Sequence, residues 1–161
     1  MKCYSKMLCF LLGIGLLVST HAAQEPSKDH AIDVSIPSEL QWNDVPSLPP
    51  GAKMAVLQGD PMKPGTFTMR MRFPKNWQVP PHTHPVDENV TVLSGTLHIG
   101  HGDRFDKSAA KAFSTGTYYS MPANMVHFGY VDEETVIQVH GQGPWGIKYI
   151  NPADDPRQGK S

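Results

Sequence analysis

Cysteine is almost absent from this chain. The only two, Cys3 and Cys9, lie at its very beginning. The rest of the chain can therefore form no disulfide bond and offers neither a thiol nucleophile nor a zinc–thiolate site. Its stability must come from a hydrophobic core.

A long hydrophobic run is also missing. The apolar stretch over residues 7–18 is shorter than the ~20 residues that span a bilayer. Lys2 and Lys6 place positive charge before this stretch, and Ala22 offers a small-residue cleavage point after it. We predict a secretory signal peptide over residues 1–23 and export to the periplasm or out of the cell. An uncleaved N-terminal anchor is the alternative.

The chain also lacks an excess of charge of either sign. The chain has 14 Lys and Arg against 15 Asp and Glu. Cleavage of the signal would remove two lysines and no acid, so the mature charge would be 12 minus 15, or −3. Such a balance argues against nucleic acid as a partner, and we expect no membrane insertion once the signal is removed.

What is present is a β pattern. Residues 66–73 alternate strictly, with Phe67, Met69, Met71 and Phe73 on one face. Further short apolar segments predict strands over 54–58, 89–93, 96–99, 116–121, 125–131, 135–140 and 147–150. Strands of this length and spacing indicate an all-β antiparallel sandwich or barrel.

The connections give further expectations. Ser94-Gly95 is typical of a tight hairpin turn between its two flanking strands. Residues 104–112 fit a loop or one helical turn. Residues 24–51 form a proline-rich extension in which alternating Ile32, Val34 and Ile36 predict a short edge strand.

The segment from Pro80 to Glu88 concentrates the chemistry of the chain. His82 and His84 stand at i and i+2 in Pro-Pro-His-Thr-His-Pro, so both imidazoles point to the same face of a strand. Glu88 opens the next apolar strand, and His127 follows a proline turn. Three imidazoles and a carboxylate can bind a divalent ion and leave positions open for a small oxygen ligand. Because the imidazoles must be neutral to bind, metal affinity should fall as the pH drops through ~6.5.

These residues also resemble a known family. His82-x-His84-x3-Glu88-x6-Gly95 is similar to the first cupin motif, and Gly116-x5-Pro122-x-Asn124-x2-His127 is similar to the second. Three positions depart from the pattern: Asn76 and Asn124 replace glycines, and Val131 replaces an asparagine.

The resemblance implies a cupin barrel of jelly-roll type over residues 52–151, followed by a tail over 152–161. It further implies that His82, His84, Glu88 and His127 bind the metal inside the barrel. Zinc, manganese and iron are comparable candidates for that ion. The resemblance also implies a homodimer in which two chains pair through an edge strand, and residues 32–36 are the candidate for that strand.

Four polar residues are candidates for the surroundings of the ion. Arg70 would bind a substrate carboxylate if its face turns inward. Gln138 and His140 share one face of a late strand, and Tyr118 lies on another strand of undetermined orientation. The alternative is that these side chains lie on the outside of the barrel.

Two functions fit this pattern. The first is an exported metal-dependent enzyme of dioxygenase, isomerase or decarboxylase type that acts on a small oxygenated or carboxylated molecule. The second is a non-catalytic module that binds or senses a small ligand through the same ion. The residues identify no general acid or base.

Overall fold

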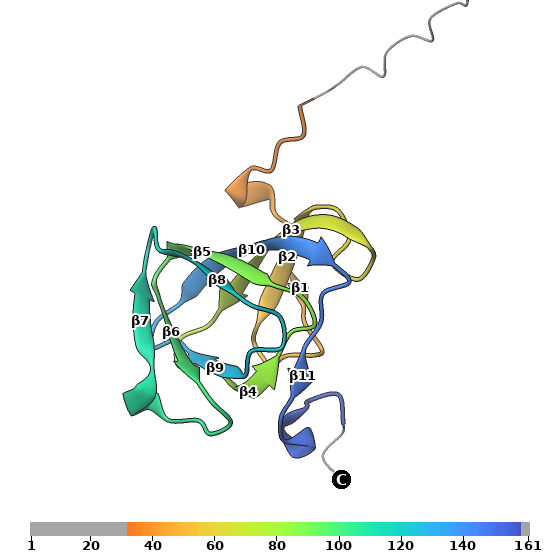
Figure 1. The fold of residues 1–161 in the computed structure, drawn as a ribbon. Helices are drawn as coiled ribbons and strands as arrows, with labels where there is room; N and C mark the ends of the chain where they lie inside the picture. Colours follow the sequence, from red (N-terminus) through yellow and green to blue (C-terminus); the bar gives the residue numbers. More distant parts are fainter. Residues whose placement is uncertain (1–31, 159–161) are drawn as a thin grey trace, which may run out of the picture. The chain divides into compact units, whose positions relative to one another are not determined.

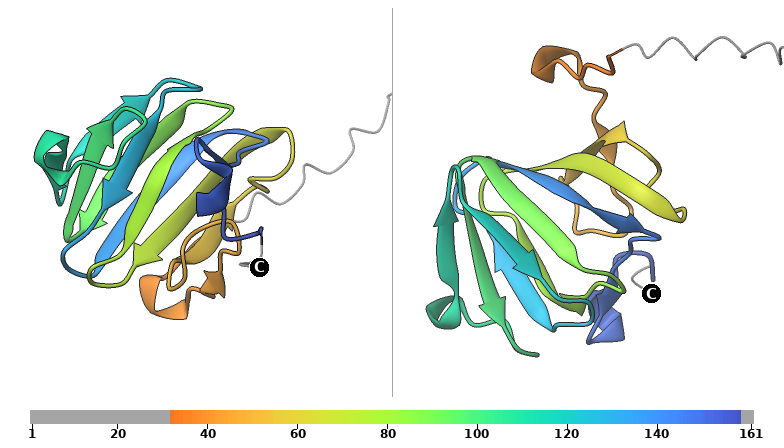
Figure 2. Two further views of the ribbon diagram at one scale, coloured as in Figure 1. Left: turned by 90° about the horizontal axis from the view of Figure 1, so that it is seen from below. Right: turned by 45° about the horizontal axis from the view of Figure 1, so that its top comes forward.

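Two antiparallel β-sheets face each other and enclose the core (Figures 1 and 2). The computed structural model describes residues 32–158, of which 35–158 form one compact unit. The predicted signal peptide lies outside the described residues. The described part contains no helix with the length and apolar character needed to cross a membrane. The expected all-β double-sheet fold is confirmed.

The larger sheet has six strands in the order β1-β2-β3-β10-β5-β8. Their bounds are β1 Asn43–Asp44, β2 Lys53–Gln58, β3 Gly65–Phe73, β5 Glu88–Ser94, β8 Tyr118–Met121 and β10 Thr135–Gly143. β3 and β10, the two longest strands, pair along their whole length at the centre of this sheet.

The smaller sheet has five strands in the order β11-β4-β9-β6-β7. Their bounds are β4 Gln78–Thr83, β6 Thr96–His101, β7 Lys111–Ser114, β9 His127–Tyr130 and β11 Lys148–Tyr149. Three short 3-10 turns complete the described elements: η1 Pro37–Glu39, η2 Lys107–Ala109 and η3 Pro152–Asp154.

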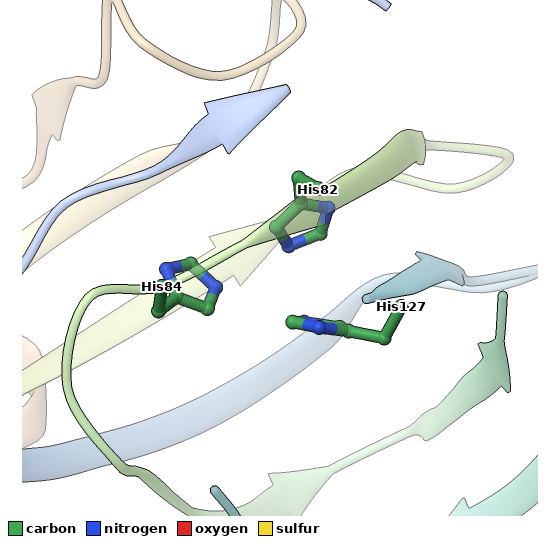
Figure 3. Close-up of side chains that lie close together, drawn as sticks. All are labelled: His82, His84 and His127. Carbon is green, nitrogen blue, oxygen red and sulfur yellow. The ribbon is translucent and has the colours of Figure 1, made fainter. Parts of the chain in front are cut away.

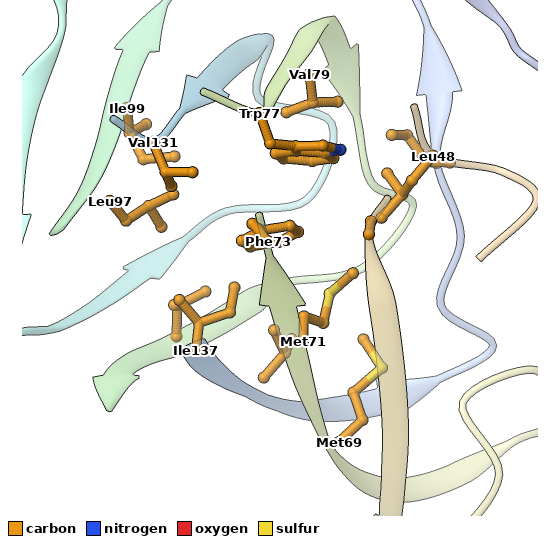
Figure 4. Packing of buried hydrophobic residues seen from close by; sticks show 14 of the residues in the cluster. Leu48, Met69, Met71, Phe73, Trp77, Val79, Leu97, Ile99, Val131 and Ile137 are labelled. Atoms are coloured by element: carbon orange, nitrogen blue, oxygen red, sulfur yellow. The ribbon is translucent and has the colours of Figure 1, made fainter. Parts of the chain in front are cut away.

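The core fills the space between the two sheets (Figure 4). All four apolar residues of the alternating β3 segment are buried, which confirms the face predicted for them. Phe73 stacks on Trp77 with the ring centroids 4.2 Å apart. Burial of each large apolar side chain contributes about 1.5–3 kcal/mol to folding.

The asparagines in place of motif glycines keep the backbone that glycine would adopt. Asn76 and Asn124 have φ of 63° and 62°. Asparagine tolerates this left-handed region better than most residues, so the turns are preserved. Val131, the third departure, packs into the core with 1% of its surface exposed.

The predicted hairpin at Ser94-Gly95 is wrong. β5 pairs with β10 and β8, whereas β6 pairs with β7 and β9. The chain therefore crosses at Gly95 from the larger sheet to the smaller one. Gly95 has φ of 76°, and a Cβ there would lie 2.5 Å from Thr135 Oγ1. Turn residues identify a sharp reversal but do not specify whether it joins two strands of one sheet.

Two other expectations about elements need correction. Residues 32–36 form no strand: they pair with neither sheet, and Ile32, Val34 and Ile36 are all exposed. β1 takes the edge position beside β2 instead. In the segment 104–112, the single turn η2 is present, but Lys111 already begins β7, which the sequence did not predict.

Candidate metal centre

Two neighbouring strands of the smaller sheet bring three histidines together. β4 and β9 are antiparallel, and their register pairs His82 with His127. His84 follows two residues after His82, just past the end of β4. All three are buried, and each offers a ring nitrogen within 4.8 Å of the others' (Figure 3).

The prolines before the first histidine shape this part of the sheet. Pro80 and Pro81 have no backbone N–H to donate to β9, and the register between β4 and β9 shifts between Val79 and His82. The irregular pairing still leaves His82 opposite His127, with ring centroids 4.2 Å apart.

A backbone carbonyl orients each imidazole. Nδ1 lies 2.7 Å from Pro80 O in His82, 2.6 Å from Gly146 O in His84 and 3.0 Å from Met125 O in His127. A carbonyl oxygen can only accept, so each Nδ1 carries the proton and donates it. Each Nε2 therefore keeps a free lone pair, the state needed to bind a metal.

The carboxylate of Glu88 reaches the same centre from the opposite sheet. Glu88 begins β5 and is buried. Its Oε1 lies 3.6 Å from His84 Nε2, and its Oε2 lies 3.7 Å from His127 Nε2. These distances are too long for hydrogen bonds. They match donors that share an ion, because two donors each ~2.1 Å from an ion lie roughly 3–4 Å apart.

Burial determines the charge state of the cluster. Desolvation lowers the pKa of His84 to about 4 and also lowers the pKa values of His82 and His127. Desolvation raises the pKa of Glu88. Three neutral imidazoles around a buried carboxylate have donors but no positive charge. A divalent cation supplies that charge, so the donor set fits a metal ion.

A small cavity of about 50 Å³ adjoins the cluster. Its wall includes all four of these side chains and is otherwise mostly apolar, with Met71, Phe73, Val79, Leu97, Ile99 and Ile137 among the lining residues. A single buried water needs ~10–15 Å³, so the cavity is several times larger than one water and suits a compact ligand.

Two further aromatic side chains of the lining bear on the site. Tyr119 contributes the only hydroxyl among the described lining residues, and its pKa is raised well above 10 by burial and by the charge of Glu88. Trp145 stacks on His84 with the ring centroids 4.6 Å apart. Its buried Nε1 has no hydrogen-bond partner within residues 32–158. Strand alternation assigns Tyr118 and Tyr119 to opposite faces of β8, but it does not indicate which of the two faces the interior.

The four polar candidates for the surroundings of the ion lie on the outside of the barrel, the alternative that the sequence left open. Arg70, Gln138 and His140 stand on the outer face of the larger sheet, because their neighbours in β3 and β10 occupy the inner face. Arg70 Nε donates to Gln138 Oε1 at 3.4 Å. Tyr118 is 56% exposed, and its hydroxyl donates to Asn89 Oδ1 at 3.0 Å. None of the four lines the cavity beside the histidines.

The fold and this site together define a cupin. Residues 30–146 match the family described as the ChrR cupin-like domain, and the chain belongs to that family. Two rice proteins (Oryza sativa subsp. japonica) are among its curated relatives. Germin-like protein 8-11 is 30% identical over 95 residues, which cover 54% of this chain and 42% of the relative. Germin-like protein 5-1 is 35% identical over 65 residues, which cover 40% and 29%. The match thus spans less than half the length of either relative.

Solved structures show the same fold at low sequence identity. The polyketide cyclase RemF from Streptomyces resistomycificus aligns with a TM-score of 0.65 and 14% identity, over 79% of this chain and 91% of that one. A putative acetylacetone dioxygenase from Methylibium petroleiphilum aligns with a TM-score of 0.57 and 15% identity, over 80% and 88%. The recognition of a cupin from its two motifs is confirmed.

Proposed function

We propose that this protein is an exported cupin that binds one divalent metal ion through His82, His84, Glu88 and His127. One observation carries the proposal. Three buried imidazoles each donate Nδ1–H to a backbone carbonyl and keep Nε2 free beside a buried carboxylate. Zinc, manganese and iron(II) all suit a donor set of three imidazoles and one carboxylate.

We further propose that the site acts on a small oxygenated molecule, by dioxygenation, isomerisation or decarboxylation. A bound ion would supply Lewis acidity toward an oxygen of the substrate. The apolar wall would exclude water from that oxygen, and Tyr119 would offer it a hydrogen bond. Structural neighbours named as a cyclase and a putative dioxygenase are compatible with such chemistry at the level of the fold.

A non-catalytic binding module is the second candidate, and the cavity lining favours it in one respect. Apart from the four proposed ligands, Tyr119 is the only titratable side chain among the lining residues. A reaction that needs a separate general base has no candidate there. Capture of a small ligand by the ion needs none.

A turnover screen of the metal-loaded protein separates the two functions. Small ketones, aldehydes and acids are incubated with loaded protein and with chelator-treated protein, and products are followed by mass spectrometry. Product that forms only with loaded protein supports the enzyme. Thermal stabilisation by a compound that is not consumed supports the binding module. If no compound reacts with the loaded protein or stabilises it, both functions are contradicted.

Export and self-association remain separate predictions. Export predicts that cell fractionation recovers a chain that lacks residues 1–23, as read from its intact mass. A full-length mass in the cytoplasmic fraction would contradict it.

The homodimer stays a prediction, although residues 32–36, its candidate edge, form no strand. Light scattering that gives the mass of one chain at high concentration would refute it.

A further inference from the structure

Within residues 32–158, no Lys or Arg lines the cavity beside the proposed ion. Arg70 and Arg72 flank the lining residue Met71 in the sequence, but their side chains lie on the outer face of β3. Arg70 bonds to Gln138, and the guanidinium of Arg72 lies 4.5 Å from the ring centroid of Trp42. Neither can neutralise a ligand in the cavity.

The charge that the site can accept is therefore fixed by the ion and its ligands. A divalent ion, the Glu88 carboxylate and three neutral imidazoles sum to +1. A singly charged ligand brings this total to zero. A doubly charged ligand leaves an unpaired negative charge against apolar side chains such as Ile99 and Ile137, and burial of an unpaired charge is costly.

We infer that the site selects compact ligands with at most one negative charge and rejects dicarboxylates. This inference rests on the proposed metal site and narrows its substrate class to small neutral carbonyl compounds, enolates and monocarboxylates. The apolar lining favours a ligand whose body is also apolar, and the size of the cavity keeps that body small.

Acetylacetone and malonate test the charge limit directly. Both coordinate through two oxygens in a six-membered ring with the metal. The two compounds have the same number of heavy atoms. Acetylacetone carries a methyl group at each end, where malonate carries a second carboxylate oxygen. The protein is loaded with cobalt(II), and each compound is titrated at one pH while the visible spectrum of the cobalt is recorded. The same titrations with aqueous cobalt give the intrinsic preference of the ion.

The protein is expected to shift the preference toward acetylacetone by more than about tenfold relative to aqueous cobalt. Arg70→Ala is the matched control and should leave the shift unchanged. An unchanged or reversed preference would overturn the inference, as would a loss of malonate binding in Arg70→Ala. Failure of the protein to take up cobalt would instead contradict the proposed metal site, so the two failures are distinguishable.

Discussion

At the scale of single residues, backbone carbonyls orient the site. Gly146 and Met125 contribute no side-chain chemistry, yet their carbonyl oxygens set the tautomers of His84 and His127. Trp145 adds an aromatic stack that restrains the ring of His84. The imidazoles are thus oriented before an ion arrives, so binding need not bear the full cost of ordering them.

Glu88→Gln separates the metal affinity from the stability of the fold. Loss of the negative charge should weaken divalent metal binding by more than about tenfold, or ~1.4 kcal/mol. The metal-free variant should be more stable than the wild type at neutral pH. Burial raises the pKa of Glu88, so the ionised carboxylate is disfavoured in the folded state. Isothermal titration and urea unfolding measure the two effects.

The exposed Glu133→Gln is the control for this substitution and should change neither quantity. A Glu88→Gln protein that binds metal as tightly as the wild type would show that Glu88 is not a ligand. A less stable metal-free Glu88→Gln protein would contradict the account of its burial.

At the scale of elements, the crossing at Gly95 joins the sheet of Glu88 to the sheet of the histidines. Gly95→Ala should destabilise the protein by roughly 3 kcal/mol, because it combines a positive φ with a clash against Thr135 and Glu134 O. Gly116→Ala has a positive φ but no atom within 4 Å, and it should cost only about 1 kcal/mol. Denaturant unfolding measures both, and equal costs would contradict the role of the crossing.

The elements also show why the sequence predicted the ligands better than their surroundings. Spacing at i and i+2 places His82 and His84 on one side of the chain, whatever the strand pairs with. The alternation of β3 had already indicated an apolar face for the interior, and Arg70 lies on the opposite face. The pairing of β4 with β9 and the sheet change at Gly95 depend on contacts between distant segments, which local patterns do not encode.

At the scale of the whole molecule, the three buried histidines should make the metal-free protein sensitive to acid. Their folded pKa values lie below the unfolded value of 6.5, so the unfolded chain binds more protons between these values. Stability should be constant above about pH 6.5 and fall as the pH decreases from there toward 4. His84 alone, with its pKa lowered to about 4, would account for a loss on the order of 3 kcal/mol.

The same lowered pKa values alter the expected pH dependence of metal binding. Protons compete less well for the folded imidazoles than for free ones, so the folded protein should hold its ion to a more acidic pH than 6.5. Thermal unfolding from pH 8 to pH 4, with and without metal, measures both effects. If the melting temperature of the metal-free protein did not change over this pH range, the burial of neutral imidazoles would be contradicted.

The central claim is tested most directly by the metal content of protein purified from its native compartment. Elemental analysis should find one equivalent of a divalent transition metal per chain. It should find less than a tenth of this in His82→Ala and an unchanged equivalent in His140→Ala, which removes a histidine from the outer face. Wild-type protein without metal that also fails to take up zinc, manganese or iron(II), or a His82→Ala protein with full content, would contradict the account.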